Sequence, residues 1–286
     1  MSGNEIKIGS AYSDFLGGAF RIPFDRPPKW LLMLTAFVDE TGQEQREGFM
    51  FVAGYLGDEQ AWRRVEEAWP KAIAPRPHLH MNRLKFRHET ERAMILRVAA
   101  VSKECGLTPI FGGVRQADYI DLVEGTAEER RLAGFLICCF PLIISTLRNI
   151  PKDERLEIVF GRQDVYWPLA DIAIATIAQA RYYPEILMSD GRHKLANWRS
   201  APQQPEDGLT EIADSFCYAL LQAYRNKTSL RARWCQPILD AHDGGYGQIF
   251  KKSEIRPLIE KTLMVRLLAD AQKLWKARGS GSTLKP

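Results

Sequence analysis

The chain has 286 residues, of which 45% are hydrophobic and 26% charged, and it carries a formal charge of +4. This composition excludes disordered and fibrous proteins, and the length is sufficient for one large α/β domain with insertions or for a main domain with a smaller one. The five cysteines are odd in number and lack CxxC spacing, which argues against a disulfide framework or a zinc knuckle.

A predicted hairpin follows an irregular arm at residues 1–30. Residues 31–38 are uncharged, mostly apolar and rich in β-forming side chains, so they predict a strand buried on both faces. The strand runs into Asp39 and Glu40 and a Thr-Gly turn, and residues 49–56 are predicted to form a second, antiparallel strand. Ionised carboxylates at the tip of a core strand must be solvated, paired or bound to a cation, unless they belong to an ordinary polar turn. Both interpretations of the acidic pair are open at this point.

The rest of the chain is predicted to alternate between helices and strands, from its hydrophobic periodicity, caps and turn residues. We expect a helix capped by Asp58 and ending near Pro70, a loop or short strand at 75–86, a helix at 89–105 ended by Gly106, a strand at 108–114 whose glycines indicate close backbone approach, and a buried helix at 127–149. We then expect a strand at 156–160, a helix at 167–181, a strand at 185–188 parallel to the previous one, a polar loop at 202–208, a mostly buried helix at 209–224 and an amphipathic helix at about 254–277.

This order of elements predicts the α/β class, with a mixed sheet of about five strands flanked by helices. We expect the main domain to span residues 31–226, with a helical insertion around 117–150, and residues 227–286 to form a basic helical C-terminal extension. From Arg225 onward the chain has 13 Lys and Arg against 5 Asp and Glu. Such a region suits contact with nucleic acid and, equally, the solvated face of a helix. Its helices are also a candidate surface for a protein partner or a homo-oligomer.

Carboxylates follow several of the predicted strands. Asp39 and Glu40 end the first strand, Asp164 comes just past the fourth, Asp190 just past the fifth, and Asp214 lies in the mostly buried helix that follows. In such sheets, sites form outside the strand ends where the topology changes. If three of these acids converge, a divalent cation would relieve their repulsion, and an all-oxygen ligand set suits Mg²⁺ or Mn²⁺. Ions held in this way stabilise both the attacking and the leaving oxygen of phosphodiester cleavage.

Each of these residues also has a structural alternative. Asp164 precedes Trp167 and would serve as the N-cap of a helix. Asp214 would pair with an arginine in a buried ion pair. Glu211, near the start of the same helix, would favour the helix dipole.

The residues named above resemble the domain of unknown function 3800 family. The resemblance covers roughly residues 31–224 and rests on the turn Asp39-Glu40-Thr41-Gly42, on Gly54 in the second strand, on Leu79-His80, and on Ile212-Ala213-Asp214 at the opening of a buried helix. It implies a ribonuclease H-like fold and metal-dependent nuclease chemistry. It also implies Asp39 and Asp214 as metal ligands, Glu40 as a ligand or a neighbouring acid, and His80 close to the site.

The chain departs from the family pattern at two places. After the fourth strand the family usually carries an acid, whereas this chain has Gly161, which has no side chain to bind a metal. Before the late Ala-Asp pair it has Thr210 and Glu211 in place of the frequent Leu-Gln. Either Asp164 or Glu211 supplies the missing oxygen, or the site binds metal weakly and the protein is a degenerate relative.

We therefore expect a nuclease that depends on Mg²⁺ or Mn²⁺ and cleaves nucleic acid. Its predicted catalytic residues are Asp39, Glu40, Asp164 and Asp214, and its predicted metal ligands are Asp39, Asp164 and Asp214. The alternative is a non-catalytic nucleic-acid-binding or assembly subunit of a larger complex.

The sequence contains no segment that we expect to enter a membrane. The longest apolar run, residues 135–144, is too short to span a bilayer and is interrupted by Pro141. Residues 1–10 are polar and lack the apolar core of a signal peptide. We therefore expect a cytoplasmic protein without a membrane partner.

Overall fold

The computed structural model describes residues 33–41, 48–123, 127–161, 171, 186–200 and 208–260. Several sequence predictions fall outside these residues. They are the arm at 1–30, Asp164, most of the helix at 167–181, most of the polar loop at 202–208 and the part of the C-terminal helix beyond residue 260.

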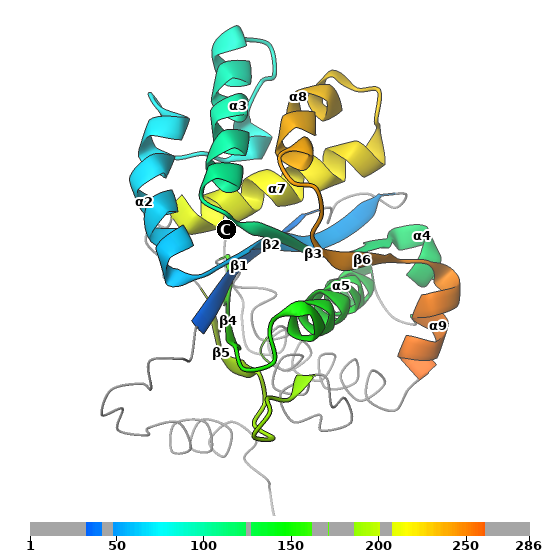
Figure 1. The fold of residues 1–286 in the computed structure, drawn as a ribbon. Helices are drawn as coiled ribbons and strands as arrows, with labels where there is room; N and C mark the ends of the chain where they lie inside the picture. The colour runs from blue at the N-terminus through cyan, green and yellow to red at the C-terminus, as the bar shows by residue number, and fades with distance from the viewer. Residues whose placement is uncertain are drawn as a thin grey trace, which may run out of the picture. The chain divides into compact units, whose positions relative to one another are not determined.

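The described strands form one six-stranded mixed sheet in the order β5-β4-β1-β2-β3-β6 (Figure 1). Their bounds are β1 Met33–Thr41, β2 Phe49–Gly57, β3 Thr108–Arg115, β4 Arg155–Phe160, β5 Leu195–Ser200 and β6 Tyr246–Phe250. β2 runs antiparallel to both β1 and β3, whereas β4 is parallel to β1, β5 to β4, and β6 to β3. The predicted mixed α/β architecture is therefore confirmed.

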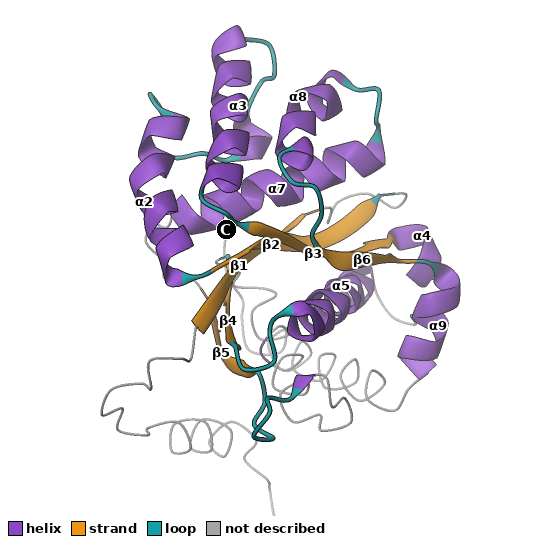
Figure 2. Ribbon diagram, viewed as in Figure 1, coloured by secondary structure: helices purple, strands orange, loops and turns teal. Residues whose placement is uncertain are grey.

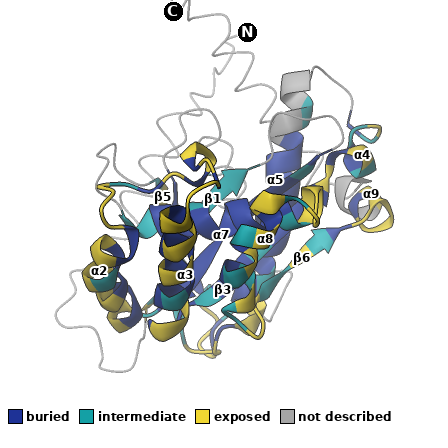
Figure 3. Ribbon diagram, turned by 90° about the horizontal axis from the view of Figure 1, so that it is seen from above, coloured by how far each residue is buried: buried dark blue, intermediate teal, exposed yellow. Residues whose placement is uncertain are grey.

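Helices cover both faces of this sheet. Their bounds are α2 Glu59–Ile73, α3 Glu89–Glu104, α4 Gln116–Tyr119, α5 Ala127–Asn149, α7 Gly208–Arg225, α8 Leu230–Asp240 and α9 Lys252–Glu260. Helices α2, α3, α7 and α8 lie on one face and α5 on the other (Figure 2). Each face has its own apolar core. Figure 3 shows α7 and most of α5 as buried, while the outer sides of α2 and α3 are exposed.

The middle of strand β1 is buried on both faces, as its composition predicts. Ala36 and Val38 belong to the core beneath α5, and Phe37 belongs to the core beneath α7. Because side chains alternate along a strand, this register places Asp39 on the α7 face and Glu40 on the α5 face. The two acids of the turn sequence therefore point to opposite sides of the sheet.

Several local predictions are confirmed. The Asp58 side chain accepts a hydrogen bond from the Ala61 N–H at 2.7 Å and caps α2. Gly106 follows α3 with a φ of 74°, the left-handed conformation of a helix C-terminal cap. A side chain at Gly112 would collide with the Cys138 carbonyl oxygen, so this glycine lets α5 approach β3 closely. All five cysteines are buried free thiols.

The predicted fifth strand is wrong. Of this range, the structure describes residues 186–188, which do not form a strand in the sheet: Leu187 makes an isolated antiparallel bridge to His193. Strand β5 begins at Leu195, which pairs with Leu156 at the start of β4. Asp190 consequently lies in an exposed turn before β5, paired with Arg192, at the opposite end of the parallel strands from Asp39.

The prediction of a wholly helical C-terminal extension is also wrong. Residues 246–250 form β6, which extends the sheet beyond β3, and α8 packs against α3 and α7. Residues 75–86 are a loop with one turn of 3₁₀ helix, η1, at Met81–Arg83. Among the described helices, none is long and apolar enough to cross a membrane.

Candidate functional site

The helix that carries Asp214 packs across the end of β1. Helix α7 contacts both β1 and β2, and the Cys217 thiol, one helical turn beyond Asp214, lies 3.4 Å from the Asp39 carbonyl oxygen, to which it donates. Cys217 also donates to the Phe51 carbonyl oxygen on β2 at 3.8 Å. The helix is held there because apolar residues on its inner face belong to the same core as Phe37. The predicted metal site requires this packing, because Asp39 and Asp214 can share an ion only if α7 lies at the end of β1.

The buried Cys217 thiol lies within electrostatic range of three predicted site carboxylates, those of Asp39, Glu40 and Asp214. Burial raises the pKa of Cys217 well above its usual value, and the negative charges of Asp39, Glu40 and Asp214 raise it further. Glu40 also raises the pKa of Cys139, which lies on α5 on the other side of the sheet. Asp39, Glu40 and Asp214 are thus brought around the end of β1, with Glu40 directed toward the α5 side.

Asp214 is partly buried in an apolar environment and bonded to the backbone. Its Oδ2 accepts a hydrogen bond from the Met81 N–H at 3.1 Å. Desolvation raises the pKa of Asp214, the Met81 hydrogen bond and the charge of His80 lower it, and the charge of Glu211 raises it. Its hydrogen-bond partner is therefore a backbone amide at the start of η1, and no described arginine forms the ion pair considered from the sequence.

Glu211, one turn before Asp214, has its carboxylate fully engaged. Its Oε2 accepts from the Trp69 Nε1–H at 2.9 Å and from the Leu79 N–H at 3.0 Å, while Oε1 lies 3.0 Å from His78 Nδ1. The residue is buried. Both oxygens thus anchor the loop to α7, which gives Glu211 a structural role larger than the dipole effect expected from sequence and does not favour it as the missing metal ligand.

Sequence reasoning missed a third buried acid, Glu91. Its carboxylate accepts from the Lys85 N–H at 3.3 Å and the Arg87 N–H at 3.4 Å, and it forms an ion pair with Arg76 at 3.0 Å. In sequence it is only an acid in the first turn of a helix, a common position for a solvated side chain. Only the fold reveals that the chain just before the helix bends back over it.

Gly161 occupies the corner next to Asp39. Its N–H donates to the Val38 carbonyl oxygen at 2.7 Å, so it continues the pairing of β4 with β1. A Cβ atom at this position would lie 2.8 Å from Asp39 Oδ1. Position 161 therefore faces the Asp39 carboxylate, so an acid there would lie beside it.

The described residues offer two carboxylates for a metal on the α7 side, Asp39 and Asp214. Within the described part of the chain, no three His, Cys, Asp or Glu side chains form a group that could hold a metal ion. Asp164, the predicted third ligand, lies outside the described residues. Mg²⁺ usually keeps several waters and takes one or two protein carboxylates together with substrate phosphates, so Asp39 and Asp214 fit such an ion.

A scan of protein-family models finds none that matches this chain, and a search of curated proteins finds no relative.

Proposed function

We propose that this protein is a divalent-metal-dependent nuclease whose ion binds between Asp39 and Asp214. The observation that carries the proposal is the packing of α7 on the end of β1, where Cys217 bonds to the backbone of Asp39 one turn from Asp214. This packing brings an acid from each element to one side of the sheet. The desolvation that raises the pKa of Asp214 is the kind of cost that a bound cation would offset.

The proposal includes a ribonuclease H-like fold and membership of the domain of unknown function 3800 family. The three antiparallel strands β1, β2 and β3, followed by β4 and β5 parallel to β1, support it. The turn acids at the end of β1 and the buried helix bearing Asp214 follow in the same order as in the family pattern.

In the proposed site the chain supplies ligands of fixed position. Asp39 is held by the pairing of β1 with β2, and the Met81 hydrogen bond orients the Asp214 carboxylate so that Oδ2 is engaged. When bound, Mg²⁺ or Mn²⁺ supplies an acidified water and charge neutralisation for the phosphate. Glu40, on the α5 face, would act on the site only from the strand end. Asp164 is retained as a proposed third ligand.

The experiment is a cleavage assay on single- and double-stranded DNA and RNA with Mn²⁺, comparing wild type, Asp39→Asn and Asp214→Asn. Both asparagines keep the shape of the side chain and remove its charge. We expect cleavage by wild type that EDTA abolishes and that each variant loses by about 100-fold or more. Asp190→Asn is the matched control, because Asp190 lies in the exposed turn at the far end of the strands. Undiminished cleavage by Asp39→Asn would contradict the site.

A second candidate function is nucleic-acid binding without turnover, and Gly161 favours it because the residue that faces Asp39 has no side chain to bind a metal. It predicts salt-dependent binding that EDTA does not change. Deletion of residues 229–286 is unsuitable as a test, since it would remove α8 and β6 from the fold. Replacing Lys273, Lys276 and Arg278 by glutamine tests the C-terminal basic region in the intact chain. Unchanged binding by this variant would exclude that region as the contact.

A further inference from the structure

The loop before α3 is fastened to the helical layer by three acids. Glu211 binds the backbone at Leu79, Asp214 at Met81, and Glu91 at Lys85 and Arg87. Each carboxylate accepts hydrogen bonds from backbone N–H groups, so the three acids fix the backbone of residues 79–87 to the helices. A loop tied at three places is preorganised rather than free to collapse.

Side chains of this loop alternate between the core and solvent. Four apolar side chains point into the core and are almost fully buried: Leu79, Met81, Leu84 and Phe86. The basic side chains between and after them are exposed: Arg83, Lys85 and Arg87. Since the buried acids use the backbone, these three side chains remain available to a ligand.

Phe86 holds the end of the loop in an unusual backbone conformation. Its φ is 54°, a left-handed value that is costly for an aromatic residue. Packing maintains it: the ring stacks on Tyr218 of α7 at 5.8 Å between centroids and contacts Trp234 of α8 at 6.0 Å. Strained positions held in this way concentrate at functional sites. The strain shows that the path of this loop is imposed by the fold.

Helix α8 adds a fourth cation to this surface. The guanidinium of Arg231 lies over the Phe86 ring, with Cζ 5.7 Å from the centroid, and the residue is exposed. We call Arg83, Lys85, Arg87 and Arg231 the basic strip. None of the four forms an ion pair with another residue of the described part of the chain.

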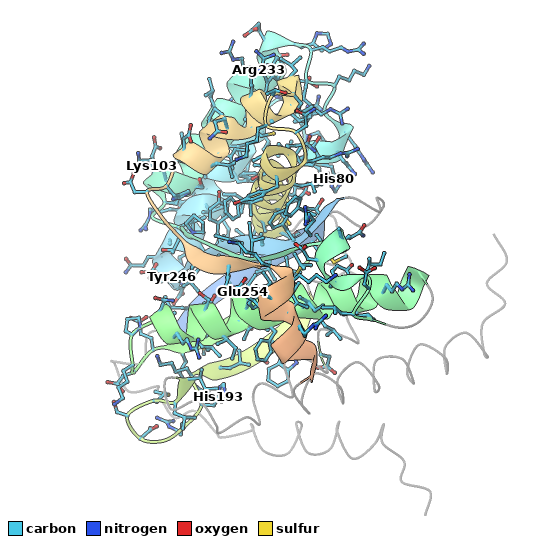
Figure 4. All side chains as sticks on the ribbon, turned by 90° about the vertical axis from the view of Figure 1, so that its right-hand side faces the viewer. His80, Lys103, His193, Arg233, Tyr246 and Glu254 are labelled. Atoms are coloured by element: carbon cyan, nitrogen blue, oxygen red, sulfur yellow. The ribbon has the colours of Figure 1, made fainter. Side chains whose placement is uncertain are left out.

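The acids near the basic strip do not neutralise it. Glu91 is buried and paired with Arg76, and Glu89 lies 3.8 Å from Arg92. Asp214 lies beneath the start of the strip, where Met81 bonds to it two residues before Arg83. In Figure 4 His80, Arg233 and Lys103 all lie on the side of the sheet that α7 and α8 cover, and Lys103 lies across this layer from His80.

We propose that the basic strip binds the phosphate backbone of nucleic acid and presents it to the site at Asp214 and Asp39. The proposal deepens the proposed nuclease function, on which it rests for the identity of the substrate. Arginine forks match phosphate oxygens in bidentate geometry, and a preorganised row of cations beside the carboxylates suits a polyanion that must approach a metal. Contacts to the backbone position the strand and carry no base sequence information, so binding is independent of sequence.

The experiment measures binding to a fluorescein-labelled DNA duplex and to its single strand by anisotropy, in EDTA so that no cleavage occurs. The variant combines Arg83→Gln, Lys85→Gln and Arg87→Gln, and the backbone N–H groups that bind Glu91 remain. The matched control combines Lys103→Gln, Lys152→Gln and Lys251→Gln, which removes the same charge from exposed positions on other elements.

We expect the strip variant to bind duplex about tenfold or more weakly at about 0.1 M salt, with the slope of log affinity against log salt reduced by about 2 to 3. The control should stay within about twofold of wild type. Equal losses of affinity in the two variants would contradict binding by the basic strip, because the overall positive charge of the protein would then explain the binding. Absence of wild-type binding, or displacement of the nucleic acid by poly-glutamate as readily as by unlabelled DNA, would overturn it as well.

The same assay separates failure of the strip from failure of the nuclease site. Binding that depends on the basic strip, without cleavage that depends on Mn²⁺, would contradict the proposed nuclease function and support nucleic-acid binding by the strip. Full cleavage activity in the strip variant would contradict a role of the basic strip in substrate binding and support the proposed nuclease function.

Discussion

The Met81 N–H donates to the Asp214 carboxylate over 3.1 Å, and this bond joins the loop before α3 to the end of the β1 strand through α7. Asp214 therefore has two tasks in our account, one structural and one as a metal ligand. The two are separable because an acceptor is sufficient for the first and a negative charge is needed for the second.

Asp214→Ala should lower the free energy of unfolding by about 1 to 2 kcal/mol. The substitution removes the acceptor and leaves the Met81 N–H without its partner. Urea unfolding monitored by circular dichroism measures the change. Asp243→Ala, at an exposed position, is the control and should change stability by less than about 0.5 kcal/mol. Equal stability of Asp214→Ala and wild type would show that the hydrogen bond does not hold the loop.

Asp214→Asn should change how stability depends on pH. Burial raises the pKa of Asp214 in the folded protein. As pH rises from about 4, the unfolded chain loses this proton first, so wild-type stability falls through the interval up to the folded pKa. Asn does not titrate, so the variant should gain stability relative to wild type across that interval. A constant difference between the two proteins from pH 4 to 7 would mean that the pKa of Asp214 is not raised.

Glu211→Ala should be more destabilising than Asp214→Ala, by roughly 3 kcal/mol relative to wild type. It leaves the Trp69 Nε1–H, the Leu79 N–H and the His78 ring without their shared acceptor. Glu211→Gln retains one acceptor oxygen and should fall between the alanine variant and wild type. Chemical denaturation ranks the three proteins, and a loss below about 1 kcal/mol in Glu211→Ala would contradict the anchoring role.

Gly161→Asp should make the fold dependent on a divalent cation. A side chain at 161 would come within 2.8 Å of Asp39 Oδ1, so a second carboxylate would repel the first. In EDTA we expect a loss of roughly 1 kcal/mol or more beyond that of Gly161→Ala, which adds the Cβ without the charge. Adding Mn²⁺ should raise the Tm of Gly161→Asp more than that of wild type. Identical Tm values for the aspartate and alanine variants, with and without Mn²⁺, would show that position 161 does not face a cation site.

The central strands and most helices could be predicted because their hydrophobic patterns are long. The β-rich run of β2 and the apolar stretch of α5 bury most of their length, and the continuous apolar run of β1 is buried at its centre. Burial on both faces leaves a pattern that local sequence displays.

The two edge strands could not be placed for the opposite reason. β5 reads Leu-Ala-Asn-Trp-Arg-Ser and β6 reads Tyr-Gly-Gln-Ile-Phe, and both are largely half-exposed. Their strand conformation depends on pairing with β4 and β3, which are distant in sequence. Residues 185–188 are more apolar than β5, so the sequence favours them as the strand, although Leu187 packs there as part of a short bridged turn.

The candidate site could be predicted only in part, because its partners are partly backbone groups. An acid inside an apolar helix signalled that Asp214 needs a partner, and the Met81 N–H that provides one has no sequence signature. The same is true of Glu91, whose acceptor role depends on the path of residues 85–87. The contact of Gly161 with Asp39 follows from the parallel register of β4 and β1.

Mn²⁺ binding to the full chain, followed by electron paramagnetic resonance, tests the central claim most directly. If Asp39 and Asp214 share an ion, wild type should bind Mn²⁺, Asp39→Asn and Asp214→Asn should each bind it at least about tenfold more weakly, and Asp190→Asn should bind as wild type does. Equal Mn²⁺ binding by wild type and Asp39→Asn, or no binding by wild type, would contradict a metal centre at the end of β1.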